Sequence, residues 1–343
     1  MERRPSFLVI RRRYLGDIVL LGSLLRNLRL HSPEGRITVL VEARWAPILA
    51  LNPDVDEARV LPGGLSAWTG FIAGLRRARI SQVIDLDNTE KTALISRLTG
   101  APVRIGIHHG SHPIKLGFLY THVVHEAESE HEAQPMSDYY LKALGPAGVP
   151  VATREVRLVP RESEVLDWRR FVGAAGRTLL VHPGSRSAWR IWPRERFAAV
   201  CDRVQDELGV QAVLVGGPSD RALVESIRSK AKVHLLTVSE PPTLTRLAAL
   251  ARASTVMLCH DSGPMHVAAA VGTPVVALYG SQNPVLFRPH GEGHTQLIPP
   301  MPCACCDAPG QCIPADSYHN HCVRALTVDQ VFGAVRAALS RAA

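Results

Sequence analysis

The chain has 343 residues, of which 46% are hydrophobic and 20% charged, so it is too long for one ordinary core and predicts two globular domains. No apolar run approaches the roughly 18 residues that cross a bilayer, and the apolar stretch at 7–10 is too short for a signal peptide, which predicts a cytoplasmic protein. The net charge of +8 favours an anionic partner: nucleic acid, a membrane surface or a phosphorylated substrate.

Short aliphatic runs alternate with helix-length segments through the first 150 residues. A typical helical segment is 18–31, whose apolar residues recur at helical spacing and which stops near Pro33. The predicted strands are 7–10, 37–41, 83–87 and 103–107. This repetition predicts a parallel sheet covered by helices on both faces, in a first Rossmann-like domain at 1–157.

The same pattern restarts after a helix predicted at 163–173. The second set of strands and turns comprises 178–185, 210–220, 255–263 and 273–280, with a helix at 197–209 that ends on glycine. We therefore expect a second Rossmann-like domain at 158–343, with the last helix, about 327–341, packing back on the first domain. The two sheets are expected to face a central cleft, because open α/β folds bind ligands at the carboxyl ends of their strands.

The turn after the first strand combines Arg11, Arg12 and Arg13 with a carboxylate at Asp17. Asp17 precedes an apolar helical run, so one interpretation is a helix cap. The other interpretation is a general base, and the residue type and position alone favour the cap. The D-x-D string at 85–87 is short enough to arise by chance, so we do not interpret it as a metal site.

Two turns of the second domain suit an anion. In the first, Gly184 and Ser185 follow a strand and Arg190 adds a fixed positive charge. In the second, Asp261 and Ser262 stand at the start of a helix, where unpaired N–H groups and the helix dipole favour a phosphate. Two anion sites in one domain suggest a pyrophosphate.

Several common sites are excluded or left open. No G-x-G-x-x-G follows the first strand and no P-loop motif occurs, which disfavours a dinucleotide dehydrogenase and excludes a P-loop ATPase. Four cysteines at Cys303, Cys306, Cys312 and Cys322 form either a thiol-rich loop or a structural metal site, because their later spacings match no common zinc finger.

In their order and spacing, these motifs resemble glycosyltransferase family 9, the ADP-heptose:lipopolysaccharide heptosyltransferases. The resemblance runs nearly end to end, from Gly16-Asp17 through the HPGS turn and the Gly216-Gly217 turn to 261–266. It implies the GT-B fold, with Asp17 as the catalytic base. The donor residues that it implies are Ser185, Arg190, Asp220, Asp261, Ser262, Gly263 and His266. Asp220 falls near the acidic ribose contact of the family, and Arg190 stands where lysine is common.

The resemblance also implies an activity. An inverting, metal-independent enzyme would move heptose from ADP-heptose to the inner core of lipopolysaccharide, an acceptor of the lipid A–Kdo type, with no cofactor. Arg11, Arg12 and Arg13 would meet the phosphates of this anionic, lipid-linked acceptor. We then expect peripheral contact with the inner face of the cytoplasmic membrane of a Gram-negative bacterium.

Three alternatives stay open. A transferase of the same fold could use another nucleotide sugar or acceptor, and a binder of sugar nucleotides could lack catalysis. A nucleic-acid-binding α/β protein would also suit the basic charge, although aromatic residues make up only 5% of the chain and do not alternate with its basic runs.

Overall fold

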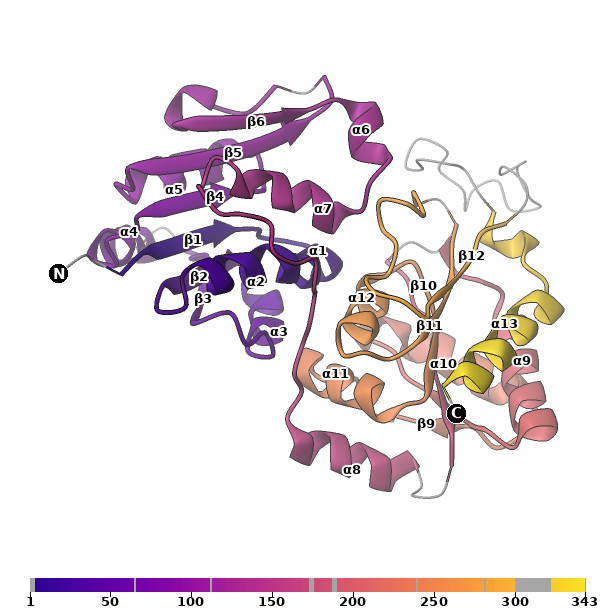
Figure 1. The fold of residues 1–343 in the computed structure, drawn as a ribbon. Coiled ribbons are helices and arrows are strands. Elements are labelled where there is room, and N and C mark those ends of the chain that lie inside the picture. Colours follow the sequence, from indigo (N-terminus) through magenta and orange to yellow (C-terminus); the bar gives the residue numbers. More distant parts are fainter. Residues whose placement is uncertain are drawn as a thin grey trace. The chain divides into compact units, whose positions relative to one another are not determined.

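The protein is described here by a computed structural model, in which two compact units span Met1–Arg157 and Leu158–Ala343. Each unit contains a six-stranded sheet (Figure 1). The residues that the structure describes are 4–64, 66–111, 113–172, 176–186, 190–238, 240–280, 282–299 and 322–342.

The first sheet has the strand order β3-β2-β1-β4-β5-β6, and its strands are parallel. Its strands are β1 (Ser6–Ile10), β2 (Arg36–Val41), β3 (Glu57–Val60), β4 (Gln82–Asp85), β5 (Val103–His109) and β6 (His122–Glu126). The helices of this unit are α1 (Leu15–Leu20), α2 (Gly22–His31), α3 (Ala46–Leu49), α4 (Ala67–Arg77), α5 (Glu90–Leu98), α6 (Glu128–Glu132) and α7 (Met136–Leu141).

The second sheet has the order β12-β11-β10-β7-β8-β9 and is also parallel. Its strands are β7 (Thr178–His182), β8 (Gln211–Leu214), β9 (Leu236–Thr237), β10 (Val256–His260), β11 (Val275–Leu278) and β12 (Thr295–Leu297). The helices of this unit are α8 (Glu162–Val172), α9 (Arg194–Leu208), α10 (Arg221–Lys230), α11 (Leu244–Ala253), α12 (Gly263–Ala270) and α13 (Val328–Arg341).

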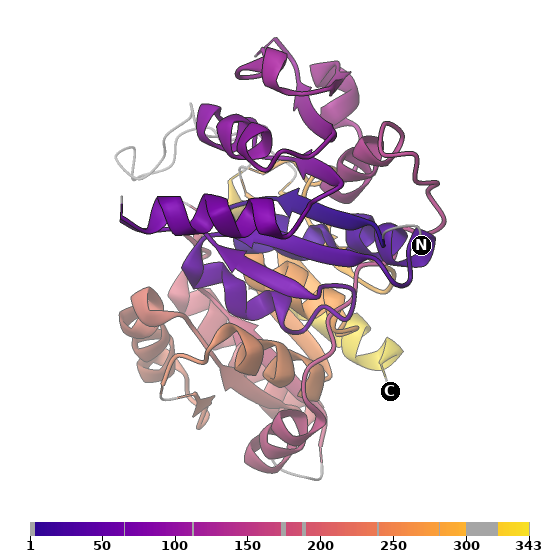
Figure 2. The same ribbon diagram turned by 90° about the vertical axis from the view of Figure 1, so that its left-hand side faces the viewer.

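Every residue of the central strands β1, β7 and β10 is buried, because helices cover both faces of each sheet. In the first unit, Leu8 and Ile10 of β1 share a core cluster with Leu75 of α4 and Ile95 of α5, so α4 and α5 cover the same face. In Figure 2, helices of the first unit, coloured indigo to purple, lie beside the strands of its own sheet. This arrangement confirms the predicted α/β fold with two parallel sheets.

The last helix, for which packing on the first domain was expected, has its apolar residues in the core of the second unit. Val331, Phe332 and Val335 of α13 belong to the cluster that contains Phe197 of α9 and Leu278 of β11. Among the described helices, none is both long enough and apolar enough to span a bilayer.

Candidate active site

Asp17 is the third residue of α1, directly after the turn that follows β1. Its Oδ1 accepts hydrogen bonds from Arg11 Nη2 at 2.6 Å and from the Tyr140 hydroxyl at 3.0 Å, and its Oδ2 accepts one from the backbone N–H of Tyr14 at 3.1 Å. The side chain is 13% exposed. The N-cap of α1 is Tyr14 and not Asp17, but the Asp17 side chain at the third helical position accepts the N–H of that N-cap residue. Asp17 thus helps to close the start of its helix, and it also belongs to a buried charge network.

This network keeps Asp17 ionised. Burial raises the pKa of the carboxyl group, but the positive charge of Arg11 and the hydrogen bonds from Tyr14, Arg11 and Tyr140 outweigh that effect, so the pKa lies below its ordinary value. Oδ2 carries only the backbone hydrogen bond. It is the oxygen with more remaining capacity to accept a proton.

Two of the three predicted acceptor-binding arginines are engaged within their own unit. Arg11 also donates to the carbonyl of Leu86 at 2.9 Å and lies 3.6 Å from a carboxylate oxygen of Asp87, while Arg12 pairs with the same Asp87 through Nε. Arg13 is exposed, with its guanidinium over the ring of Tyr14. Of the three, Arg13 presents the most accessible charge.

The two aspartates of the D-x-D string, Asp85 and Asp87, have different structural roles. Asp87 holds Arg11 and Arg12, and Asp85 is buried and accepts a hydrogen bond from the Tyr120 hydroxyl at 2.7 Å. Burial raises the pKa of Asp85 to about 6. Asp87 can pair with Arg11 and Arg12 because β1 and β4 are neighbours, so the turns at their carboxyl ends meet.

In the second unit, the predicted donor residues gather at one edge of the sheet. Strands β8, β7 and β10 are neighbours, and because all three are parallel, the turns at their carboxyl ends lie side by side. The predicted residues in these turns are Ser185 after β7, Asp220 after β8, and Asp261, Ser262 and Gly263 after β10, followed by His266 in α12.

Asp220 fixes the shape of two of these turns. Its Oδ2 accepts a hydrogen bond from the backbone N–H of Gly217 at 2.8 Å. A Cβ atom at Gly184 would collide with the same carboxylate, so glycine allows the Asp220 side chain to lie directly against the backbone beside Ser185. This contact joins the turns after β7 and β8 into one surface.

Asp261 is a buried carboxylate at the mouth of α12. It is 6% exposed, and neither of its oxygens has a hydrogen-bond partner among the described residues. Burial raises its pKa to about 7 although Arg190 lowers it. Ser262, the N-cap of α12, offers no side-chain hydrogen bond to the helix. Pro264 has no N–H and the N–H of Met265 donates to the carbonyl of Ser262 at 3.0 Å, so the N–H of Gly263 and the positive end of the helix dipole are what this helix start offers an anion.

Arg190 is buried and is held from more than one side. In the orientation that satisfies both groups, the amide oxygen of Gln282 accepts from Arg190 Nη1 at 2.9 Å. Two residues later, the backbone N–H of Trp192 donates to His260 Nε2 at 2.9 Å and its indole donates to the carbonyl of Leu326 at 2.9 Å. The bonds of Trp192 fix the chain close to Arg190, and the bond to Gln282 holds the guanidinium itself.

His260 accepts this bond as a neutral imidazole. Burial, with the nearby His182, lowers its pKa to about 3. The roles of His260, Gln282 and Tyr140 were not predicted from the sequence. Each acts through a contact between residues distant in the chain, although the position of His260 at the end of a buried strand, directly before Asp261, was a usable signal.

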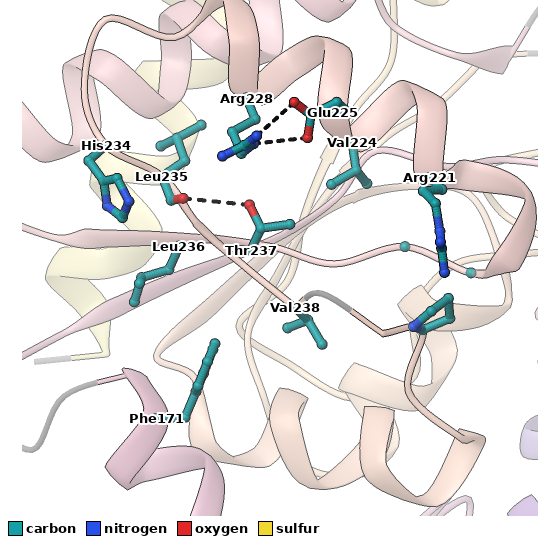
Figure 3. A pocket seen from close by; sticks show the side chains of 13 residues that line it. Phe171, Arg221, Val224, Glu225, Arg228, His234, Leu235, Leu236, Thr237 and Val238 are labelled. Carbon is teal, nitrogen blue, oxygen red and sulfur yellow. Dashed lines mark hydrogen bonds and ion pairs between the residues drawn. The ribbon is translucent and has the colours of Figure 1, made fainter.

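A cavity of about 610 Å³ opens beside the turn after β8 (Figure 3). Gly216 and Gly217 border it, Leu236 and Val238 come from β9 and the residue after its end, and Arg221 comes from the start of α10. The cavity is lined mainly by apolar groups on the β9 side and carries charged groups of α10 at its rim. The cavity adjoins Gly217, whose N–H donates a hydrogen bond to Asp220.

Comparison with known proteins decides the family. Residues 68–311 match the model of glycosyltransferase family 9 (heptosyltransferase). The chain is a member of glycosyltransferase family 9. It is 28% identical over 304 residues to lipopolysaccharide heptosyltransferase 3 of Escherichia coli K12, covering 83% of this chain and 85% of that protein.

Two solved structures share the fold. A family 9 glycosyl transferase from Veillonella parvula has a TM-score of 0.81 at 24% identity and covers 99% of both chains. The E. coli ADP-heptose lipopolysaccharide heptosyltransferase II has a TM-score of 0.79 at 24% identity, covering 98% of this chain and 99% of that one. These structures confirm the GT-B fold predicted from the resemblance.

As a family 9 member the protein is a glycosyltransferase, and the residues that it would use can be placed. The structure brings the donor candidates of the second unit to one sheet edge, and Asp17 to the corresponding edge of the first sheet. The possible metal site cannot be placed, because Cys303, Cys306 and Cys312 lie outside the described residues. Cys322 is described and is half-buried.

Proposed function

We propose that this family 9 glycosyltransferase moves a heptose from ADP-heptose to a hydroxyl group of the lipopolysaccharide inner core, on an acceptor of the lipid A–Kdo type. The observation that carries the proposal is the match, over most of the chain, to proteins named lipopolysaccharide heptosyltransferases. A solved structure of the same fold contains ADP, and another contains ADP-2-deoxy-2-fluoro heptose.

The second unit is the proposed donor site. The N–H of Gly263 at the start of α12 and the guanidinium of Arg190 would hold the diphosphate, and Ser185 would donate a further hydrogen bond. The Oδ2 atom of Asp220 accepts from the Gly217 N–H, and its Oδ1, which accepts from the Ser219 hydroxyl at 3.4 Å, would also accept from a ribose hydroxyl. The adjoining cavity would take the base between apolar side chains of the β9 region.

The buried carboxylate of Asp261 supports a sugar substrate. A carboxylate that has lost its contact with water and gained no donor among the described residues is costly. Sugar hydroxyl groups would supply the missing donors. We propose that Asp261, together with His266 of α12, orients the heptose of the bound donor.

The proposed chemistry is one displacement at the anomeric carbon. The acceptor hydroxyl gives its proton to Oδ2 of Asp17 while its oxygen forms a bond to that carbon, and the bond from the carbon to the diphosphate breaks on the opposite face, so the configuration inverts. ADP leaves with the bonding electron pair. Arg190 and the start of α12 stabilise its growing negative charge, which is why we propose that no metal ion is required.

The acceptor side is proposed on the first unit, close to Asp17. Arg13 has an accessible charge there, and Arg11 and Arg12 contribute to the positive field while they hold the Asp17 and Asp87 carboxylates. An acceptor that carries acyl chains would be reached at a membrane surface, so we propose a cytoplasmic enzyme with peripheral contact to the membrane.

The decisive test combines the purified enzyme with ADP-heptose and defined truncated core acceptors. We expect ADP release and a product heavier by one heptose, in the presence of EDTA as in its absence. Asp17→Asn should lower kcat by about 10²–10⁴-fold and leave ADP affinity within about twofold. Full activity of this variant would remove Asp17 as the base, and turnover only with another nucleotide sugar would favour the alternative donor.

A further inference from the structure

One outer face of the first unit combines exposed apolar and basic side chains. Helix α5 buries Thr92, Ala93, Ile95 and Ser96 and turns a stripe of other residues to solvent. Along this stripe Leu94 is 49% exposed and Leu98 is 38% exposed. Lys91 and Arg97 flank them at helical spacing and are also exposed.

The segment after β5 extends this face. The backbone N–H of Lys115 donates to Asn88 Oδ1 at 2.7 Å, close to the start of α5, and Arg104 Nε donates to the carbonyl of Leu119 at 2.8 Å. The short helical turn Gly117–Leu119 contacts α5. Phe118 in this turn is 82% exposed, the highest value among the exposed large hydrophobic residues.

Positive charge predominates around these apolar side chains. Residues 88–121 contain the basic residues Lys91, Arg97, Arg104 and Lys115 against a single acidic residue, Glu90. Within the described part of the chain, no carboxylate pairs with Lys91, Arg97 or Lys115, and Lys91 lies 4.8 Å from the ring centre of Trp68 on α4. Burial and the nearby Arg97 lower the pKa of Arg104.

We propose that this basic–apolar patch, formed by Lys91, Leu94, Arg97, Leu98, Lys115 and Phe118, docks on the surface of an anionic lipid membrane. The cations would meet lipid phosphates, and Phe118 with the two leucines would enter the boundary between headgroups and acyl chains. Separate apolar side chains among cations that no described carboxylate neutralises fit such a boundary, whereas a protein interface concentrates its apolar residues and excludes charge from its centre.

The position of the patch suits a lipid-linked acceptor. Lys115 is tied to Asn88, which follows the Asp87 that pairs with Arg11 beside Asp17. The patch therefore begins at the sheet edge that carries the proposed base. This step deepens the proposed function, since it names the surface that would bring the first unit to a membrane-embedded acceptor.

The first test measures binding alone and does not depend on the proposed reaction. The full-length protein is sedimented with vesicles of phosphatidylcholine, with and without phosphatidylglycerol. We expect binding only to the anionic vesicles, weakened by salt. The double variant Arg97→Gln/Lys115→Gln should bind about 25-fold more weakly, at about fivefold for each cation, and Phe118→Ser at least about tenfold more weakly.

Matched controls lie on the second unit. Lys232→Gln removes an exposed cation and Leu166→Ser an exposed apolar side chain there, and both should bind vesicles as the unchanged protein does. Equal loss in the controls, or no loss in the patch variants, would overturn the proposal. So would a loss of self-association in Phe118→Ser with unchanged vesicle binding, because the patch would then be a protein interface.

The second test uses turnover with two forms of the acceptor. The patch variants should keep the rate of the unchanged protein on a water-soluble, deacylated acceptor and should lose rate, in parallel with vesicle binding, on the same saccharide embedded in anionic vesicles. Lost vesicle binding with equal rates on both acceptors would contradict the link to catalysis. If the unchanged protein turns over neither acceptor yet binds vesicles, the proposed reaction fails and the docking surface stands.

Discussion

At the scale of single residues, the two carboxylate oxygens of Asp17 have different hydrogen-bond partners and different proposed roles. Oδ1 receives both side-chain hydrogen bonds, from Arg11 and Tyr140, and Oδ2 receives only the backbone bond from Tyr14. The side-chain bonds fix the plane of the carboxylate. They also hold its pKa below the ordinary value. The carboxylate is therefore ionised and able to accept a proton over a wide pH range, but it is a weaker base than an ordinary carboxylate.

Tyr140→Phe tests whether the hydrogen bond to Oδ1 holds the pKa of Asp17 low. Tyr140 is fully buried, so phenylalanine should fill the same space and remove only the hydrogen bond to Oδ1. The carboxylate loses a donor that favours its ionised form, so its pKa rises and the acid limb of the kcat–pH profile should move to higher pH, while kcat at pH 8 falls by less than about tenfold. Tyr139→Phe, one residue earlier on α7, is the control and should leave the profile in place.

Asp261→Asn tests the cost of the buried carboxylate. Its pKa of about 7 lies above the ordinary 3.8, so between these pH values the folded chain holds a proton that the unfolded chain has released. Folding stability is therefore lost as pH rises through this window. Asparagine removes the titration, so the variant should be nearly as stable as the unchanged protein near pH 4.5 and more stable at pH 8.

Thermal unfolding at the two pH values measures this difference. ADP-heptose affinity should fall in the same variant at pH 8, because the amide cannot replace the carboxylate toward sugar hydroxyls. A variant that is less stable at pH 8 than the unchanged protein would show that Arg190 offsets the burial of Asp261 in full. Ser262→Ala is a suitable comparison, since it alters the same loop and leaves the charge unchanged.

At the scale of elements, the sequence predicted central strands and missed edge strands. The eight predicted strands all exist, within a few residues of their expected bounds. The four that were not predicted are β3, β6, β9 and β12, and these are the edge strands of the two sheets. A central parallel strand is buried on both faces and reads as an apolar run, whereas these edge strands carry mixed, partly exposed residues.

The same reasoning explains which site residues were foreseen. Turns directly after apolar runs are visible in the sequence, so Asp17, Ser185 and Asp261 could be placed. Tyr140 lies 123 residues from Asp17, and nothing local in the chain indicates their contact. Asp87 was set aside as part of a chance string for the same reason, since its pairing with Arg11 appears only when β1 and β4 become neighbours.

Gly184→Ala tests how the turns after β7 and β8 depend on each other. The new methyl group should push the Asp220 carboxylate off the Gly217 N–H, destabilise the protein by about 1–2 kcal/mol and weaken ADP binding. The double variant Gly184→Ala/Asp220→Ala should cost less than the sum of the two single changes, because the collision is absent. Additive effects in unfolding experiments would contradict a direct contact.

At the scale of the whole molecule, one strand order occurs twice. In each unit the first strand stands at the centre, two strands follow on one side and three on the other. The turns on either side of the reversal carry Arg11 and Asp87 in the first unit, and Ser185 and Asp261 in the second. Open α/β sheets bind ligands at such a reversal of strand order, so the fold supplies one site in each unit. The side chains decide the role of each site. In the first unit, arginines pair with carboxylates, whereas the second unit offers the start of a helix and a carboxylate that has no hydrogen-bond partner among the described residues.

Hydrogen exchange with ADP tests this assignment on the intact chain. Because each unit has its own core, the nucleotide should slow exchange most at the donor turns, at 184–185, 216–220 and 261–265, and much less at 11–17. Arg190→Gln should reduce the protection at 261–265 more than at 216–217, since it removes a phosphate contact and leaves the base cavity unchanged. Strong protection at 11–17 with none at 261–265 would place the nucleotide on the first unit and reverse the proposed roles of the two sheets.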